Sequence, residues 1–364
     1  MGDLTERRVF LDAGGSAPMT VRTREAFHAA IDEGWADPDR LHAESRRAHA
    51  LLHGAAQAIA AILGSPASST ILVPTFGLAF DRAIGGVAKG RKGRSRIVAT
   101  AVERKPALRV ASRHSDAVDL LAVRADGRVD VSEIRATLGD DVSLALVQHA
   151  NQETGVIQDL EGVREATSAA GVPLVVDATA SVGHVAAPDS WDVVVADPAD
   201  WGAPRGVAVV ASRPPTRLAP IPPMVDGRVN VAAALAAAVA LEEREENREA
   251  TAARLAALAD RIRVAAAELP DTVVFTPSEP ALPHLVTFAC SRADGEAVAA
   301  ELDRRGIAVG SGSACTVEPS PESHVWAAYG VDSRGVVRIG LHPGVSDADV
   351  DRLVVALGDA ISAA

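Results

Sequence analysis

The sequence contains very little lysine. Among its 364 residues only Lys89, Lys92 and Lys105 carry a side-chain amine, and arginine supplies the rest of the 36 basic residues. Residues 106–364 therefore offer no amine to a carbonyl group, and neither arginine nor aspartate can replace it in a Schiff base. Covalent catalysis through a lysine is excluded from that part of the chain.

Cysteine and positive charge are also scarce. Cys290 and Cys315 are the only thiols, too few for a disulfide framework or a four-thiolate metal site within one chain, so reduced thiols are expected. The excess of 48 acidic over 36 basic residues gives a formal net charge of −12, which repels polyanions and argues against a DNA or RNA partner. The short basic run at 89–94 (KGRKGR) fits a solvated loop better than a phosphate site.

Long hydrophobic runs are absent. The opening residues 1–15 (MGDLTERRVFLDAGG) contain no apolar stretch of signal-peptide length. The alanine-rich stretch 231–241 is too short to span a bilayer before the acidic residues that follow it. We therefore expect a soluble cytoplasmic protein with no membrane partner.

What the sequence does contain is a balanced composition, with 48% apolar and 23% charged residues, and a regular alternation of strand and helix patterns. Stretches 130–138 and 159–169 have the apolar spacing of crossover helices and open near an acidic residue. Short apolar runs, typical of strands buried on both faces, lie at 70–73, 96–99, 142–147, 174–176, 193–196 and 206–210. This order indicates an α/β fold with a mostly parallel sheet.

The pattern changes after residue 206. A proline-rich stretch at 212–224 leads into one long helical pattern over 230–269, which ends at Pro270, and we interpret the change as a domain boundary. Beyond it we expect a smaller α+β unit. Its predicted strands are 285–288, 307–309 and 336–341, and its predicted helices are 294–305 and 347–363.

Polar residues follow two of the predicted buried strands. Asp177, in the stretch 175–183 (VVDATASVG), ends one strand, at the edge where parallel sheets bind ligands. Asn151, Gln152 and Glu153, in the stretch 149–160 (HANQETGVIQDL), follow another strand and should share that edge. Helix or loop capping is the alternative role for these residues.

Near the C-terminus one thiol lies in a glycine- and serine-rich stretch. Residues 309–316 read VGSGSACT, so Cys315 directly follows a predicted strand and is flanked by Gly310 and Gly312. This setting predicts a mobile, exposed and reactive thiol, whereas Cys290, inside LVTFAC, is predicted to be a core residue. A packed, inert Cys315 remains the alternative.

Taken in order, these segments resemble the cysteine desulfurases, which are pyridoxal-phosphate (PLP) proteins of the aminotransferase class V group. The resemblance covers almost the whole chain. It is carried by FLDAGGSAP at 10–18, the HANQETG strand end, VVDATASVG, the APRG turn at 203–206, GSGSACT and VVRIGL at 336–341.

The resemblance implies a homodimer of PLP-transferase-like chains. Each chain would have a three-layer αβα large domain at 15–245 and a small α+β domain made of 1–14 and 250–364. Asp177 matches the carboxylate that pairs with the pyridine nitrogen, and Gln152 would also contact the cofactor. Asn151 and Arg338 would bind the substrate, with Arg338 as the clamp for its carboxylate. Cys315 matches the sulfur-accepting nucleophile.

The catalytic lysine of that family is missing here. The family carries Ser-Gly-His-Lys before its Gly-Pro-Lys-Gly turn, whereas this chain reads Asp-Pro-Ala-Asp at 197–200, which places Asp200 at the lysine position. Other cofactor contacts change with it. By the same resemblance the ring-stacking histidine falls on Arg104, the phosphate-binding turn on Phe76, Gly77 and Leu78, the phosphate-binding serine on Asp197, the glutamine at the phenolic oxygen on Ala180, and the threonine donated across the dimer on Arg228.

Three hypotheses follow from these departures. The first is a desulfurase homologue with no covalently bound cofactor, which handles sulfur through Cys315, uses it as an iron–sulfur ligand, or acts as a regulator. Its partner would be a sulfur-acceptor or iron–sulfur scaffold protein. Noncovalent PLP or an iron–sulfur cluster stays open as its cofactor, and no other metal site is expected. The second is an enzyme that uses Asp177, Asp200, Arg104 and Arg338 on a small carboxylated molecule. The third is an interaction protein without a small-molecule site.

Overall fold

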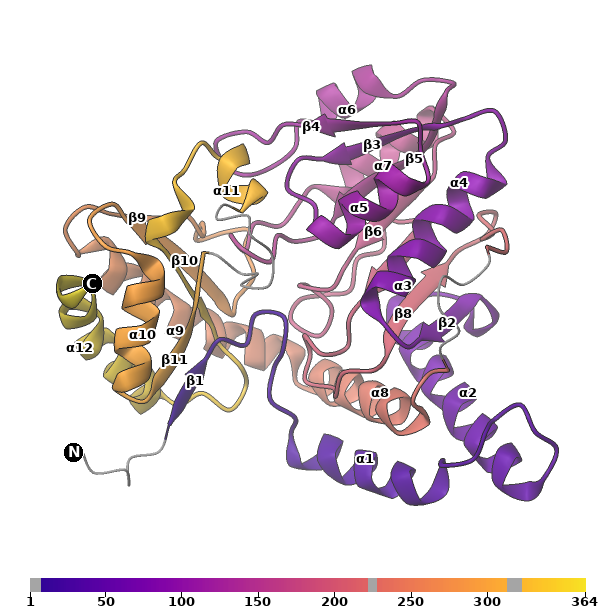
Figure 1. Ribbon diagram of the computed structural model, residues 1–364, viewed down its shortest axis with the longest axis horizontal. Helices are drawn as coiled ribbons and strands as arrows, with labels where there is room; N and C mark the ends of the chain where they lie inside the picture. Colours follow the sequence, from indigo (N-terminus) through magenta and orange to yellow (C-terminus); the bar gives the residue numbers. More distant parts are fainter. Residues whose placement is uncertain (1–7, 222–227, 313–322) are drawn as a thin grey trace.

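The computed structural model describes residues 8–221, 228–312 and 323–364, which form two sheets with separate hydrophobic cores (Figure 1). The larger sheet has the strand order β2-β8-β7-β6-β5-β3-β4. Its strands are β2 (Thr70–Val73), β3 (Arg96–Thr100), β4 (Ala117–Leu121), β5 (Val142–Gln148), β6 (Leu174–Asp177), β7 (Val193–Ala196) and β8 (Ala208–Ser212). The pairs from β4 through β7 are parallel, and β8 pairs antiparallel with both β7 and β2, so the predicted α/β fold with a mostly parallel sheet is confirmed.

Helices pack on both faces of the large sheet because its central strands are apolar on both sides. Every residue of β5 is buried, with Val147 facing one core cluster and Leu146 the other. One face is covered by α2 (Ala43–Leu63), α6 (Val131–Thr137), α7 (Leu160–Ala169) and α8 (Val231–Glu246), with α1 (Val21–Glu33) packed outside against α8. The other face is covered by α3 (Phe76–Phe80), η2 (Asp81–Gly85), α4 (Gly86–Gly90) and α5 (Lys105–Arg113), and the short 3-10 turn η1 (Ala67–Ser69) precedes β2.

The smaller sheet has the order β1-β11-β12-β10-β9 and brings the two ends of the chain together. β1, near the N-terminus, pairs parallel with β11. The strands of this smaller sheet are β1 (Val9–Leu11), β9 (Thr272–Val274), β10 (Leu285–Cys290), β11 (Ile307–Ser311) and β12 (Val336–Gly340). Its helices are α9 (Arg248–Ala267), α10 (Gly295–Arg304), α11 (His324–Ala328), η3 (Ser333–Gly335) and α12 (Asp347–Ala363). The limits 15–245 and 250–364 remain a prediction for the domains.

The long helix predicted over 230–269 is wrong in one respect. The structure has two helices, α8 and α9, which meet at Asn247, where φ is −124° and ψ is 14°. These angles lie outside the α-helical region, so the chain changes direction and α9 packs on the small sheet while α8 stays on the large one. Nothing in the glutamate-rich sequence around Asn247 signals this break.

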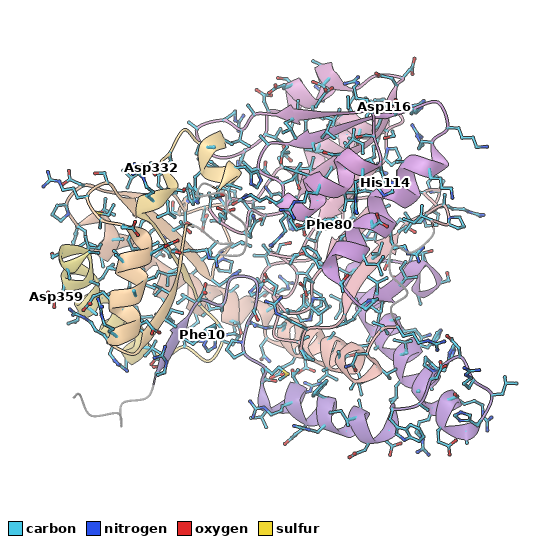
Figure 2. All side chains as sticks on the ribbon, in the orientation of Figure 1. Phe10, Phe80, His114, Asp116, Asp332 and Asp359 are labelled. Carbon is cyan, nitrogen blue, oxygen red and sulfur yellow. The ribbon has the colours of Figure 1, made fainter. Side chains whose placement is uncertain are left out.

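The two parts face each other across the carboxyl ends of β3, β5, β6 and β7, and side chains fill much of the space between their ribbons (Figure 2). Phe10 of β1 lies on one side, and Phe80, the fully buried last residue of α3, lies on the other. The edge where parallel strands end is where α/β sheets bind ligands. None of the helices in the described ranges has both the length and the apolar character needed to cross a membrane.

Candidate active-site cleft

A cleft of about 470 Å³ lies between the two sheets. It collects side chains from both ends of the chain, including Phe10 and Asp12 from the N-terminal segment and Arg338 from β12. The large sheet contributes the segments that follow its strands. Of the residues that the sequence singled out, the cleft is lined by Phe76, Arg104, Gln152, Glu153, Asp197, Gly312 and Arg338.

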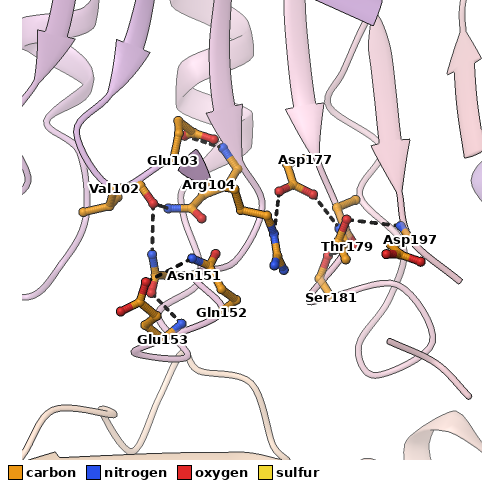
Figure 3. A network of polar contacts seen from close by, with 12 residues as sticks. Val102, Glu103, Arg104, Asn151, Gln152, Glu153, Asp177, Thr179, Ser181 and Asp197 are labelled. Carbon is orange, nitrogen blue, oxygen red and sulfur yellow. Dashed lines mark hydrogen bonds and ion pairs between the residues drawn. The ribbon is translucent and has the colours of Figure 1, made fainter. Parts of the chain in front are cut away.

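Arg104, which lines the cleft, forms an ion pair with Asp177, which is buried behind the lining (Figure 3). Asp177, the last residue of β6, is 2% exposed, and its Oδ2 accepts a hydrogen bond from Arg104 Nε at 2.9 Å. Its Oδ1 accepts from the backbone N–H of Thr179 at 2.9 Å. Both carboxylate oxygens are therefore engaged by the protein's own donors, and the guanidinium carbon of Arg104 lies 5.7 Å from the centre of the Phe76 ring.

A second acidic residue lies behind this pair. Glu103 is fully buried, and its Oε1 accepts hydrogen bonds from Thr100 Oγ1 at 2.6 Å and from the backbone N–H of Gln148 at 2.8 Å. Burial raises the pKa of Glu103 to about 8, an effect that these hydrogen bonds oppose. Glu103 is therefore mostly protonated at neutral pH and adds no negative charge beside the Arg104–Asp177 ion pair.

Asn151, Gln152 and Glu153 lie where the sequence placed them but point to different partners. Asn151 is fully buried, and its Oδ1 accepts from the backbone N–H groups of Glu153 and Thr154. The Asn151 side chain therefore holds the loop in place, which is the capping role given above as the alternative. Gln152 instead reaches the cleft, and its buried Oε1 accepts no hydrogen bond from any described residue. Roles for Asn151 and Gln152 in binding stay predictions.

Asp200 lies away from the cleft lining. It is 1% exposed, and its Oδ1 accepts a hydrogen bond from Nε2 of the buried His184 at 2.9 Å. The ring of His284, which precedes β10, stacks on His184 with 3.7 Å between ring centres. Burial raises the pKa of Asp200, and burial lowers the pKa of His184 to about 3.

Asp197 does line the cleft, three residues before Asp200. Burial raises the pKa of its carboxyl group, which accepts a hydrogen bond from the backbone N–H of Ala199 at 3.1 Å. A carboxyl group in this position is a poor neighbour for a phosphate.

Arg338 extends from β12 into the cleft, where its Nη2 donates to Asp12 Oδ1 at 3.0 Å. The Arg338 guanidinium lies close beside Gly310 of β11. A Cβ added to that glycine would lie 3.2 Å from Arg338 Nη2. Cys315 lies outside the described residues. Gly312 and Ser323, the described residues on either side of it, both line the cleft, and Ser323 Oγ donates to Glu153 Oε2 at 2.7 Å.

The remaining positions of the family's cofactor contacts are occupied differently. Phe76 lines the cleft, Leu78 packs against the core beneath α3, and Ala180 is buried beside Leu282. Arg228 is exposed and pairs with Asp37 and Asp39, so its charge is directed to the segment between α1 and α2.

Sequence reasoning missed four functional candidates. Lys105 and Arg205 both line the cleft, and Lys105 follows Arg104 directly. The sequence could have predicted both positions, because Lys105 adjoins Arg104 and Arg205 lies in the APRG turn at 203–206. The stacked pair His184 and His284 gave no such signal, because the two histidines are far apart in sequence and match no ligand spacing.

A mostly parallel α/β sheet, a second sheet built from both chain ends and a charged cleft between them define a fold of the PLP-dependent transferase class. The aminotransferase class-V family model matches residues 9–215 and 207–353, and the chain belongs to this family.

Curated relatives and solved structures agree with this assignment. The cysteine desulfurase NifS of Azotobacter vinelandii is 27% identical, over 95% of this chain and 90% of its own length. The IscS-like cysteine desulfurase of Mycobacterium tuberculosis is 29% identical, over 98% of this chain and 96% of its own. The solved structure of a NifS-like protein superposes with a TM-score of 0.89 at 22% identity, covering 98% of this chain and 99% of that one, and a NifS-like protein from Rickettsia africae gives 0.86 at 18%, covering 98% and 100%.

The family is PLP-dependent, which raises the question whether these residues fit that cofactor. A carboxyl group stands at position 200, both oxygens of Asp177 are engaged, and Phe76 replaces a small residue of the phosphate turn. These residues do not fit covalently attached PLP. Lys105 is the amine that the described part of the cleft offers.

Proposed function

We propose that this protein is a desulfurase homologue that works without a Schiff base to PLP and handles sulfur or an iron–sulfur cluster through Cys315. The observation that supports the proposal best is the Arg104–Asp177 ion pair, because it satisfies the carboxylate that the resemblance assigns to the pyridine nitrogen. The buried carboxyl group of Asp200 supports it further. The sulfur step would then belong to the thiol alone.

That step is a transfer of sulfane sulfur. The Cys315 thiolate would attack the outer sulfur of a persulfide donor, form a new S–S bond and release the donor as a thiol, with no external oxidant or reductant. The outgoing step would repeat this exchange on a thiol of an acceptor protein. Gly312 and Ser323 line the cleft, so the segment that carries Cys315 starts and ends at that cleft.

The partners we propose are a second copy of the chain and a sulfur-acceptor or iron–sulfur scaffold protein. A cytoplasmic location belongs to the same proposal, because reduced thiols are needed for sulfur exchange. The negative net charge favours a protein partner over a nucleic acid.

Persulfide labelling tests the proposed thiol step. The wild-type chain, Cys315→Ser and Cys290→Ser are incubated with a low-molecular-weight persulfide, and peptide mass spectrometry locates added sulfur. We expect the wild type and Cys290→Ser to gain one sulfur atom on Cys315 and Cys315→Ser to gain none, because Cys290 is only 2% exposed. Equal protection of both cysteines in the native wild type would overturn the role of Cys315.

Absorption spectroscopy and borohydride reduction test the proposal that the protein forms no Schiff base with PLP. After addition of PLP, the wild type should show no aldimine band and no pyridoxyl-lysine after reduction. Lys105→Arg is the matched variant, because Lys105 is the amine that lines the described cleft. A pyridoxyl group trapped in the wild type and lost in Lys105→Arg would contradict the proposal.

A second candidate function, the binding or conversion of a small carboxylated molecule, is favoured by the cations of the cleft. Arg104, Lys105, Arg205 and Arg338 all line it. Thermal-shift measurements with a series of mono- and dicarboxylic acids would test this function. A rise in Tm that Arg205→Gln abolishes would favour it, and no response across the series would exclude it.

A further inference from the structure

Away from the cleft lining, three buried side chains meet between the two sheets. His184 and Asp200 follow β6 and β7 of the large sheet, and His284 precedes β10 of the small one. One ring nitrogen of each histidine and one carboxylate oxygen of Asp200 all lie within 4.8 Å of one another. The exposures of His184, Asp200 and His284 are 4%, 1% and 2%.

The polar atoms of this cluster are poorly satisfied by the protein. Nδ1 of His184 and Nδ1 of His284 are both buried and have no hydrogen-bond partner among the described residues. Each such buried atom without a partner is destabilising, because it has lost its hydration without gaining a hydrogen bond. A hydrogen bond from His184 Nε2 is the contact that the structure gives to the Asp200 carboxyl group.

The buried cation Arg244 does not form an ion pair with this cluster. Arg244 is buried, but its Nε donates to the backbone oxygen of Trp201 at 3.0 Å rather than to Asp200. The two imidazoles also stack nearly parallel, with 18° between their planes, an arrangement that suits neutral rings and not two imidazolium cations. The cluster therefore presents neutral nitrogen donors and one carboxyl group that no arginine contacts directly among the described residues.

We propose that His184, Asp200 and His284 form a binding site for a divalent transition-metal ion of the zinc class. Two imidazoles and one carboxylate are a donor set that such ions prefer. Tetrahedral coordination with bonds of about 2.1 Å separates ligand atoms by about 3.4 Å, and the three ligand atoms here lie within 4.8 Å of one another. Binding would require one of the two stacked rings to rotate, so that a nitrogen lone pair of each histidine points at the ion. The positive charge of the ion offsets the buried carboxylate.

The position of the site gives the ion a structural role. Because two ligands come from the large sheet and His284 comes from the small one, a bound ion would connect the two halves next to the cleft. Arg244 and Arg338 contribute positive charge nearby, which weakens cation binding. We therefore expect the site to bind the metal ion with micromolar affinity, more weakly than a site without nearby arginines would bind it.

Cobalt(II) substitution tests the site, because four-coordinate cobalt in such a donor set has visible ligand-field bands. The full chain is treated with a chelator and titrated with Co²⁺, and then with Zn²⁺ as competitor. We expect one Co²⁺ per chain, visible bands that Zn²⁺ removes, and a higher Tm in the metal-bound protein. Absence of any bands or Tm shift at micromolar to millimolar Co²⁺ would overturn the proposal.

Two variants make the test specific. Asp200→Asn keeps the shape of the side chain and removes its charge, so it should fold like the wild type, shown by circular dichroism, and lose the bands and the Tm shift. His49→Ala/His53→Ala removes an exposed histidine pair on α2 that could chelate metal on its own, and it should leave both signals unchanged. Signals that persist in Asp200→Asn, or that vanish in the His49/His53 variant, would contradict the assigned site.

If Asp200→Asn does not fold, His284→Gln serves in its place, because it removes the ligand from the other half of the molecule. Wild-type signals in folded His284→Gln would equally contradict the proposal. The result is independent of sulfur transfer, since the site includes neither Cys315 nor Arg104.

Discussion

At the scale of single residues, the resemblance places charged side chains at two positions where the family has other residues, and each of them is bound to another side chain of the protein. Arg104 stands at the position of a stacking ring and is bound to Asp177. Asp200 stands at the position of an amine and is bound to His184. Each replacement has a partner inside the protein, so reversing one of them alone leaves the others in place.

Asp200→Lys should therefore not restore the release of alanine and sulfide from cysteine. The new amine would enter a site that is 1% exposed, beside two histidines, while Arg104 still holds Asp177. Assays for alanine and sulfide in the presence of PLP measure this. Asp200→Lys/Arg104→His is the comparison variant, and turnover by the single variant at the level of an active desulfurase would show that the Arg104–Asp177 pair is no obstacle.

Glu103 should make the protein less stable in alkali. The pKa of Glu103 is about 8 in the folded protein, well above the ordinary range of a glutamate, so the folded state holds a proton that the unfolded chain releases. Its contribution is complete below the unfolded value and is lost as pH rises through about 8. The free energy of unfolding, measured in urea at about pH 5 and about pH 9, should fall less in Glu103→Gln than in the wild type. Identical pH profiles would show that Glu103 is ionised in the fold.

At the scale of elements, the N-terminal segment forms one side of the cleft because it lies directly on β12. The backbone N–H of Ala13 donates to the oxygen of Gly340 at 3.0 Å, and Asp12 binds Arg338. The contact is close because Gly340 has no side chain. A Cβ at this position would lie 2.5 Å from the backbone nitrogen of Gly14.

Gly340→Ala should therefore displace residues 12–15 from β12 and lower the free energy of unfolding by about 1–3 kcal/mol, the range typical of overpacking. Hydrogen exchange at Ala13 should become faster. Gly54→Ala on α2, where an added Cβ meets nothing within 4 Å, is the matched control and should be neutral or slightly stabilising. Unchanged exchange in Gly340→Ala would contradict the close contact.

The same scale shows what the sequence could and could not predict. β7 lies within the predicted limits because its run of apolar residues is buried on both faces of the sheet. β2 was also predicted from an apolar run, although it is an edge strand that pairs antiparallel with β8 and leaves Ile71 40% exposed. β4, with the edge pattern AVDLL, was missed because a strand half exposed to solvent needs no such run. The Arg104–Asp177 contact joins residues 73 positions apart, and only the tertiary fold brings them together.

At the scale of the whole molecule, two large apolar side chains are strongly exposed in one surface segment. Trp35 is 72% exposed and Leu41 is 91% exposed, in the segment between α1 and α2. Arg228, at the position that the resemblance assigns to a contact across the dimer, pairs with Asp37 and Asp39 of the same segment. This segment is our candidate for the dimer interface.

Light scattering at micromolar concentration should show a dimer, and Trp35→Glu/Leu41→Glu should shift it toward a monomer, because burying the new charges is unfavourable. Val264→Glu/Val355→Glu alters two exposed valines on α9 and α12 and should leave the dimer intact. A wild-type monomer, or equal dissociation in both variants, would contradict the interface.

The alanine-rich helix α8 has a further consequence for how this sequence can vary. Ala233, Ala236 and Ala237 are fully buried on it, and α8 packs against both α1 and α2. Buried alanine loses no side-chain rotamers on folding, but it also leaves no room for a larger residue. In a saturation library selected for folded protein, we expect these positions to accept glycine and serine at most, while the exposed glutamates at the end of the same helix exchange freely. The helix would thus keep a recognisable signature in distant descendants even after the cleft residues had drifted.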